Sequence, residues 1–336
     1  MRKAFKSVER TLLLIIVSLG LLACQGDVKS SSMFRIVSMA PNWTQTVVEV
    51  GAKDQLVGVT HFCIFPEDIP KLVKDGKLMS VGGFTNISIS KVESLNPDLV
   101  LTATGLQLKY HEEFDKKNIS FIHMEGSSLA ETYEKIFALG NSIKKDKEAT
   151  ALVEEIKSKL TMLENVYSGL PEVKVYYEIN YANKCVPGAD SYIAELMRIA
   201  GADPVYSDRP GIAPSVSWEE AVSAQPEVIL LPWWETAWEE GPHFEGPRIG
   251  YGTTTIAEVA QREDAQRVPA VRTGRVRYIH SARTKQAGPQ IPVAVQLFAE
   301  AIHAPGDLNR LRMDYVPKIM EEQDGRVIES SASNAP

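Results

Sequence analysis

The sequence predicts an α/β protein of two Rossmann-like lobes, each with a central parallel sheet, joined by one long helix. Three observations support this fold class. Short β-rich runs alternate with helical or loop stretches, which favours parallel strands with helical crossovers. One long segment has apolar residues at helical spacing, and one sequence unit occurs twice, once on each side of that segment.

The expected strands fall into two similar series. In the first half of the chain the β-rich runs are 34–38, 55–59, 98–104 and 119–124. In the second half they are 173–179, 228–234 and 275–280, with helices expected at 191–200 and near 290–303. The segment 147–167 is predicted to be a helix, because Leu152, Ile156 and Leu160 share one face. A helix of that length spans about 30 Å, roughly the width of one domain.

A repeated unit supports two lobes of common design. Residues 88–101 (SISKVESLNPDLVL) align without gaps with the first fourteen residues of 217–231 (SWEEAVSAQPEVILL). Two serines and one proline coincide, and each unit then enters an apolar run. Each unit predicts a capped short helix, a proline that ends it and a buried strand. Since α/β proteins often repeat such units, coincidence is the alternative to duplicated lobes.

The first 23 residues are typical of an export signal. A basic head precedes an apolar run at 11–23, which is shorter than the ~20 residues that a membrane span needs. The run ends in Leu-Leu-Ala-Cys, which resembles the lipobox of bacterial lipoproteins, so Cys24 is the predicted lipidation site. We expect an exported protein, held to the cell membrane by lipid alone and facing the periplasm or cell exterior. An ordinary signal peptide with a chance cysteine is the alternative.

These signals divide the chain into six parts. They are a signal peptide (1–23), a lipidated tether (24–33), an N-terminal lobe (34–127), a helical bridge (128–169), a C-terminal lobe (170–306) and a C-terminal tail (307–336). The roughly 310 residues after the leader suit two lobes better than one core.

Composition and motifs argue against several classes of protein. A net charge of −7 argues against nucleic acid as a partner. Cys63 and Cys185 do not make a disulfide framework, and no C-x-x-C or H-E-x-x-H spacing indicates a metal site. No G-x-S-x-G, P-loop or G-x-G-x-x-G motif supports catalysis. We therefore expect a monomer that is not an enzyme, with no catalytic residue, metal site or cofactor of its own.

Several ordered blocks of the sequence resemble one family. They are residues 35–66, VGGFTN at 81–86 before LNPDLVL, GADSYIAELMRIAGADPVYSD, VSWEEAVSAQPEVILL, and RVPAVRTGRVRYI before a Gly-Pro and a last helix. Together they cover about 34–305 and resemble the periplasmic binding proteins for cobalamin and iron-siderophores, of the helical-backbone type. The resemblance implies a ligand cleft between the lobes.

The resemblance also implies a function. The chain would be a substrate-binding lipoprotein of an ABC importer, delivering its ligand to a permease with its ATPase. The implied ligand is a corrinoid of the cobalamin type, with a ferric siderophore or haem as the alternative. Any cobalt or iron would then belong to the ligand.

Ligands of open α/β sheets bind beyond the carboxyl ends of the strands. In the first lobe, this rule and the family pattern point to Trp43, Phe65 and Phe84 as ligand-binding residues. A flat aromatic ring suits the face of a corrin or porphyrin, because it buries a large area at low entropic cost. Packing of Phe65 in the core is the alternative. His61 is expected to be a loop residue rather than an axial ligand to a metal.

The second-lobe candidates lie in loops and segments expected to face the ligand. They are Cys185, Tyr192, Arg209, Trp233, Trp234, Arg283 and Lys285. Exposure of two neighbouring indole side chains just past a strand end costs free energy, so we expect the pair to contact a ligand. Arg283 and Lys285 would meet carboxylates or a phosphate of the ligand. The alternatives are packing of the indoles under an insertion at 236–250 and plain surface solvation of the two cations.

The resemblance also implies that one surface acid on each lobe docks to arginines of the permease, steering association. Glu219 matches the acid of the second lobe. In the first lobe the matching residue is Ser90, a departure from the family pattern. Glu93 is the expected substitute, because residues three apart share a helix face. Otherwise docking would be one-sided, or the protein would be a permease-independent surface receptor.

Overall fold

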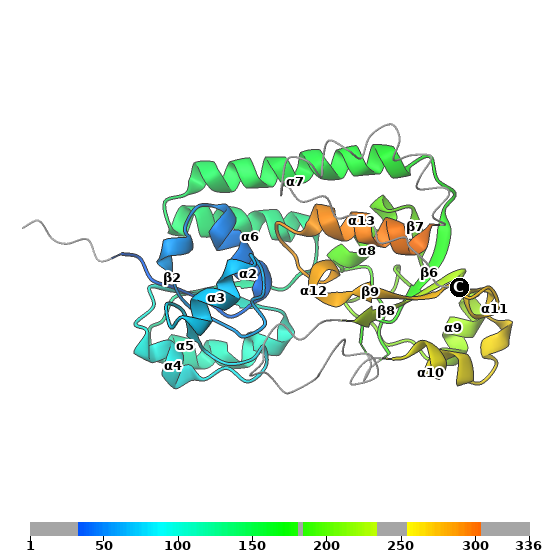
Figure 1. Cartoon of the computed structure of the whole chain (residues 1–336), viewed down its shortest axis with the longest axis horizontal. Helices are drawn as coiled ribbons and strands as arrows, with labels where there is room; N and C mark the ends of the chain where they lie inside the picture. Colours follow the sequence, from blue (N-terminus) through cyan, green and yellow to red (C-terminus); the bar gives the residue numbers. More distant parts are fainter. Residues whose placement is uncertain (1–32, 181–183, 234–253, 304–336) are drawn as a thin grey trace, which may run out of the picture. The chain divides into compact units, whose positions relative to one another are not determined.

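The computed structural model describes residues 33–180, 184–233 and 254–303 (Figure 1). The described residues from Arg35 onward belong to one compact unit. The predicted leader, Cys24, Trp234 and the tail at 307–336 lie outside the described residues, as does the side chain of Trp233.

Five parallel strands form the first sheet. They are β1 (Ile36–Ser38), β2 (Leu56–Val59), β3 (Met79–Ser80), β4 (Leu99–Ala103) and β5 (Phe121–Met124), in the order β3-β2-β1-β4-β5. Every residue of β4 is buried, as expected for a strand inside a parallel sheet. Ile36 lies beside Leu56 on one side and Leu99 on the other, so the amino ends of these strands share one edge.

Four parallel strands form the second sheet. They are β6 (Val173–Tyr177), β7 (Ala202–Pro204), β8 (Val228–Trp233) and β9 (Val276–His280), in the order β7-β6-β8-β9. The two parallel sheets confirm the predicted α/β class. The sequence did not predict β3 and β7, because strands of two and three residues are too short to show a pattern.

Helices and 3₁₀ turns connect the strands. In the first half they are α2 (Pro41–Glu49), η1 (Lys53–Gln55), α3 (Asp68–Lys74), α4 (Ile89–Ser94), η2 (Gly105–Tyr110), α5 (His111–Lys116) and α6 (Leu129–Ser142). In the second half they are α8 (Tyr192–Ile199), α9 (Trp218–Ala224), α10 (Ile256–Gln261), η3 (Ala265–Arg267), α11 (Pro269–Arg272), α12 (Ser281–Thr284) and α13 (Ile291–Ile302). Each sheet packs a hydrophobic core of its own, around Val100 and Phe114 in the first half and around Tyr176 and Ile229 in the second.

One long helix, α7 (Asp146–Tyr167), matches the helix predicted at 147–167. Its 22 residues span about 33 Å at 1.5 Å per residue. It buries Leu152, Ile156 and Leu160 and packs on α6 and α13, which belong to different halves of the chain (Figure 1). Among the described residues, no helix is both long and apolar enough to span a membrane.

The repeated unit begins with a capped helix in both halves. The Ser88 hydroxyl accepts a hydrogen bond from Lys91 N at the start of α4. At the start of α9, the Ser217 hydroxyl accepts one from Glu220 N, and Glu220 Oε2 accepts one from Ser217 N. The second pair is a capping box, and the two caps confirm the capped helix predicted for each unit. Each capped helix leads into a buried strand, β4 or β8.

Candidate functional site

Loops at the carboxyl ends of the first sheet are tied together by one buried glutamine. Gln107 has no exposed surface. Its Oε1 accepts a hydrogen bond from Ala103 N at 2.9 Å, and its Nε2 donates to Met39 O at 2.8 Å and to Phe84 O at 2.9 Å. The side chain therefore connects the segments that follow β1, β3 and β4. Sequence reasoning missed Gln107, because a lone glutamine in an irregular segment shows no pattern.

Further hydrogen bonds hold the loop that carries Phe84. The Tyr110 hydroxyl donates to Thr85 O at 2.7 Å. His61 N donates to Gly82 O at 3.0 Å, which joins the segment after β2 to the same loop. These loops are therefore ordered by the fold itself, and little conformational entropy is lost when a ligand contacts them.

Large apolar side chains are exposed at this edge of the sheet. Phe62 follows β2 and is 38% exposed, and Leu106 and Leu108 in η2 are 59% and 49% exposed. Phe65 and Phe84 are partly buried in the same set of loops. Exposed apolar side chains on ordered loops are typical of a binding surface. The sequence pointed to Phe65 and Phe84 but not to Leu108.

Trp43 does not join this surface. Its side chain is fully buried, and its Nε1 donates to Thr102 O at 2.8 Å. Because α2 begins at the carboxyl end of β1, this hydrogen bond holds the helix against β4. The structure therefore gives Trp43 a packing role.

Three second-half candidates are engaged by contacts within the fold. Cys185 and Tyr192 are buried, and burial raises the pKa of both side chains. Arg209 Nη2 donates to Glu220 Oε1 at 2.5 Å, and its guanidinium lies 4.2 Å from the centre of the Tyr206 ring. Cys185 and Tyr192 therefore expose little surface for a ligand, and Arg209 is held by contacts within its own half of the chain.

Arg283 and Lys285 lie in the segment that follows β9, at the carboxyl edge of the second sheet. The Arg283 guanidinium lies 4.5 Å from the centre of the Phe65 ring, so the structure brings together two candidates from different halves of the chain. Lys285 Nζ donates to Ile179 O at 3.0 Å. Burial lowers the pKa of Lys285 to about 8, against a smaller opposing effect of Cys185.

The segment between α12 and α13 also contacts the first half directly. Asn42 Nδ2 donates to Ala287 O at 3.0 Å. Gly288 packs so closely on α2 that an added Cβ would lie 3.3 Å from Thr46 Oγ1. These contacts hold the first turn of α2 next to the segment that carries Lys285.

A buried carboxylate lies at the carboxyl end of β6. Glu178 is 1% exposed, and the Arg262 guanidinium donates to both of its oxygens, at 2.8 and 3.2 Å. Lys184 Nζ donates at 3.3 Å, and the hydroxyls of Tyr176 and Thr254 donate as well. Burial acts to raise the pKa of Glu178, but the bonds from Arg262 and Thr254 outweigh it, so that the pKa is lowered. Sequence reasoning missed this network, because Glu178 and Arg262 are 84 residues apart.

A chain of polar side chains links β4 and β5. Thr102 Oγ1 forms hydrogen bonds with His111 Nε2 at 3.0 Å and His123 Nδ1 at 2.9 Å. His123 Nε2 is 2.9 Å from Glu125 Oε2, which orients the ring. No group of three or more His, Cys, Asp or Glu side chains in the described part of the chain is arranged to hold a metal ion.

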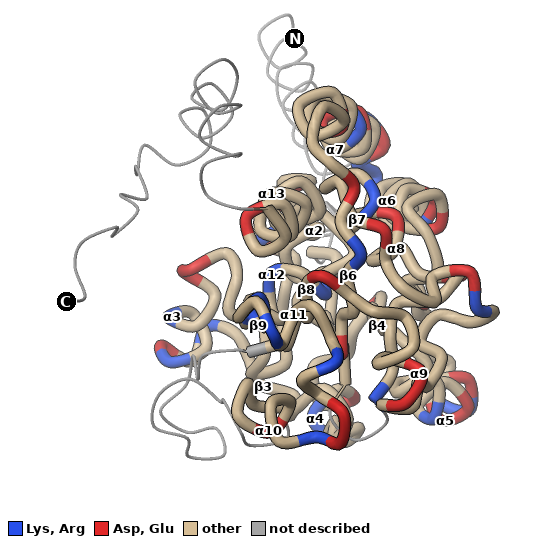
Figure 2. The backbone as a smooth tube through the Cα atoms, turned by 90° about the vertical axis from the view of Figure 1, so that its right-hand side faces the viewer, with Lys and Arg blue, Asp and Glu red and all other residues tan. Residues whose placement is uncertain are grey.

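The two predicted docking acids differ in their surroundings. Glu93 Oε1 accepts a hydrogen bond from Lys117 Nζ at 2.5 Å, so its charge is balanced. Glu219 is exposed in the first turn of α9, and no ion pair to it occurs among the residues that the structure describes. Ser90 Oγ is bonded to Ser88 Oγ at 3.1 Å. Figure 2 shows acidic positions along α9 and both signs of charge along α5.

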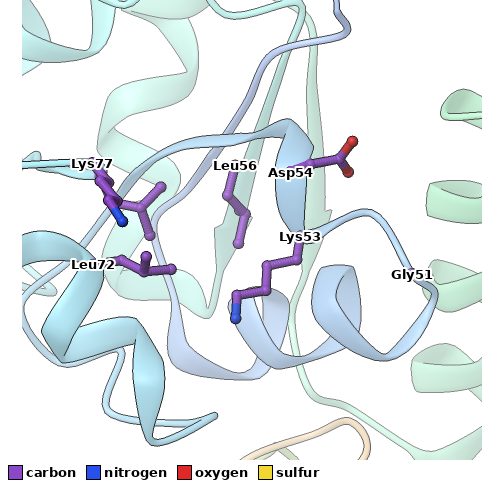
Figure 3. A pocket seen from close by; sticks show the side chains of 7 residues that line it. Gly51, Lys53, Asp54, Leu56, Leu72 and Lys77 are labelled. Atoms are coloured by element: carbon purple, nitrogen blue, oxygen red, sulfur yellow. The ribbon is translucent and has the colours of Figure 1, made fainter.

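A separate hollow lies at the opposite end of the first sheet (Figure 3). Its volume is about 520 Å³, and it is lined by Gly51, Lys53, Asp54, Leu56, Leu72, Lys77 and Leu78. Leu56 begins β2, so the hollow lies at the amino ends of the strands, away from the predicted ligand-binding residues. None of those residues lines it.

A family comparison assigns the chain to a known class of protein. The family model described as periplasmic binding protein matches residues 36–282. The chain therefore belongs to the periplasmic binding protein family, as the resemblance of its sequence blocks predicted. Proteins of this family bind solutes.

The curated relatives are distant but cover most of the chain. The vitamin B12-binding protein of Vibrio vulnificus (strain YJ016) is 22% identical over 227 residues, which are 67% of this chain and 78% of the relative. A Bacillus subtilis (strain 168) relative is named "Uncharacterized ABC transporter substrate-binding lipoprotein YvrC". It is 24% identical over 277 residues, which are 80% of each chain.

Solved structures share the two-lobe fold. The crystal structure of periplasmic vitamin B12 binding protein BtuF of Vibrio cholerae has a TM-score of 0.60 and 18% identity, covering 83% of this chain and 97% of that chain. Periplasmic heme-binding protein RhuT from Roseiflexus sp. RS-1, in its apo form, has a TM-score of 0.62 and 18% identity, covering 80% and 98%. At these identities the likeness establishes the fold alone.

Removal of the buried charge at Glu178 should be strongly destabilising. Glu178→Gln should lower the free energy of unfolding by about 3 kcal/mol at neutral pH, because it leaves the buried Arg262 guanidinium with only the more exposed carboxylate of Glu258, at 3.3 Å, as a charged partner. Since the folded pKa of Glu178 is lowered, its stabilisation is present above the ordinary value of 4.5 and is lost as the pH falls below it. Urea unfolding from neutral to acidic pH should therefore show a shallower acid loss in the variant than in wild type. Glu172→Gln, at an exposed glutamate, is the control, and wild-type stability of Glu178→Gln would contradict the assignment.

Proposed function

We propose that this chain is the substrate-binding lipoprotein of an ABC importer, which captures a corrinoid and delivers it to a permease with its ATPase. The observation that carries the proposal is the set of apolar side chains on the loops that Gln107 holds at the carboxyl edge of the first sheet. A pre-ordered apolar surface suits a receptor for a large flat ligand. Membership of the periplasmic binding protein family and the name of the Bacillus subtilis relative support the importer role.

The corrinoid assignment has two supports. Phe62, Phe65 and Phe84 supply aromatic rings from neighbouring loops, and such rings suit the flat face of a tetrapyrrole-like macrocycle. Several curated relatives are named vitamin B12-binding proteins. Haem or a ferric siderophore is the alternative ligand, and heme-binding proteins with the same fold support it.

Anchoring by lipid at Cys24 completes the proposal. The apolar run that ends at Cys24 supports it, as does the word lipoprotein in the name of the Bacillus subtilis relative. An anchored receptor stays close to the membrane, which raises its effective concentration at a permease.

Calorimetric titration of the mature chain tests the ligand. We expect cyanocobalamin to bind at micromolar concentration, with haemin and a ferric siderophore binding more weakly. Binding of haemin or the siderophore without the corrinoid would transfer the assignment to the alternative ligand. Absence of binding for all three compounds would remove the proposal.

Truncation of Phe84 should weaken binding of the preferred compound. Burial of a phenyl side chain contributes roughly 1.5–3 kcal/mol, so Phe84→Ala should raise the dissociation constant about 10- to 100-fold. Phe137→Ala, at an exposed phenylalanine of α6, is the matched control and should bind as wild type does. If calorimetry gives Phe84→Ala wild-type affinity, Phe84 does not contact the ligand.

Docking to the permease should depend on Glu219 more than on Glu93. Glu219→Ala should slow association with a permease in lipid nanodiscs and make the rate less sensitive to salt, because an exposed charge steers the encounter. Glu93→Ala should have a smaller effect, since Lys117 already balances that charge. Glu172→Ala is the control, and an unchanged rate for Glu219→Ala would end the docking role. If the wild-type chain associates with no permease, the surface-receptor alternative is favoured.

A further inference from the structure

Lys285 is a partly buried cation without a charged partner among the described residues. Its Nζ donates to Ile179 O, a neutral acceptor, at 3.0 Å. Arg283, two residues earlier, lies over the Phe65 ring and forms no ion pair within the described part of the chain either. This segment therefore holds two cations that no described carboxylate balances.

The titratable groups that contact Lys285 or act on it add no negative charge at neutral pH, and the nearby carboxylate of Glu178 is already bonded to Arg262. Burial raises the pKa of the Cys185 thiol, which is the group that acts electrostatically on Lys285. Tyr177, which contacts Thr284 next to Lys285, is buried, and its pKa is raised as well. Both groups are therefore neutral, and Lys285 bears the cost of a desolvated charge: its pKa falls to about 8.

Two helix N-termini lie next to the segment that carries Lys285 and add positive potential there. Neither α2 nor α13 has an acidic residue in its first turn or a side-chain cap. Asn42, in the first turn of α2, donates to Ala287 O, which brings the two helix starts to one segment. Gln290 precedes α13, is 6% exposed, and its Oε1 has no hydrogen-bond partner among the described residues. A ligand with an anionic group and a hydrogen-bond donor matches this set of groups.

We propose that Lys285, with Arg283 beside it, is the subsite that receives an anionic group of the ligand, a carboxylate or a phosphate. This inference rests on the proposed function, because it assigns part of that ligand to named residues. A desolvated ammonium is costly unless a partner satisfies it, and a ligand anion supplies the partner that the described fold does not. Charge-assisted hydrogen bonds from both cations then orient the ligand, with its flat face near Phe65.

Binding of an anionic ligand at this subsite is coupled to protonation of Lys285. The anion favours the ammonium form of Lys285, so the chain takes up protons on binding at pH values above about 8, and affinity falls as the pH rises further. In the ligand-free chain the folded pKa lies below the ordinary value of 10.5. The unfolded chain therefore binds more protons between about pH 8 and 10.5, and stability rises with pH over that window.

Pairs of compounds that differ in their anionic groups test the subsite. Wild type should bind haemin more tightly than haemin dimethyl ester, or cyanocobalamin more tightly than dicyanocobinamide, which lacks the phosphodiester together with the rest of the nucleotide loop. The expected difference is about 10- to 100-fold in the dissociation constant. Lys285→Met should lose this preference and Lys285→Arg should keep it. Lys174→Met, at an exposed lysine of β6, is the matched control. A Lys285→Met chain that keeps the preference would overturn the proposal.

A second measurement does not depend on the identity of the ligand. Inorganic phosphate, compared with chloride at equal ionic strength, should raise the melting temperature of wild type and Lys174→Met but not of Lys285→Met. Ligand-free Lys285→Met should also be more stable than wild type at neutral pH and lack the rise in stability above about pH 8. If no chelate binds while these differences appear, the proposed ligand fails and the anion subsite stands. If these differences are absent, the anion subsite fails whatever the chelates show.

Discussion

Parallel strand pairing is the constraint on which the rest of this structure depends. Each parallel strand needs a crossover that returns the chain to the same end of the sheet, so the loops after the strands gather at one edge. In the first sheet that edge carries Phe62, Phe84 and Leu106. Gln107 joins the loop of Phe84 to its own segment, and the backbone bond from His61 to Gly82 joins the loop of Phe62. The apolar surface is therefore a consequence of sheet topology, and hydrogen bonds between its loops, several of them from Gln107, keep it ordered. Ligand binding at the strand ends follows the general rule for open α/β sheets.

Two desolvated charges in the second half of the chain, those of Glu178 and Lys285, differ in how well the surrounding protein satisfies them. Glu178 accepts hydrogen bonds from Arg262, Lys184 and neighbouring hydroxyls, so the protein itself satisfies its charge. That network connects β6 to the end of α10 and has a structural role. Lys285 has one neutral acceptor, so its charge stays unsatisfied within the described fold. A charge of the second kind is the better candidate for contact with a ligand, because a ligand gains free energy by satisfying it.

How much of this protein can be predicted from its sequence depends on the range of each interaction. The long helix and the capped helices of the repeated unit were predictable, because they depend on residues a few positions apart. Strands β3 and β7 were not, since they are too short to show alternation. Trp43 was assigned to the ligand surface from its place after a strand, but the same place suits a core residue. Its burial and its bond to Thr102 O depend on β4, which lies far away in the sequence.

By itself, the sequence determined the α/β class, the helix between the two halves and membership of the periplasmic binding protein family. These follow from local periodicity and from blocks of adjacent residues. Only the tertiary structure decided which candidates lie together and which are buried. Phe65 meets Arg283, and Glu178 meets Arg262, across long stretches of chain. Such pairs leave no local pattern, because burial and charge balance are set by segments that come together only when the chain folds.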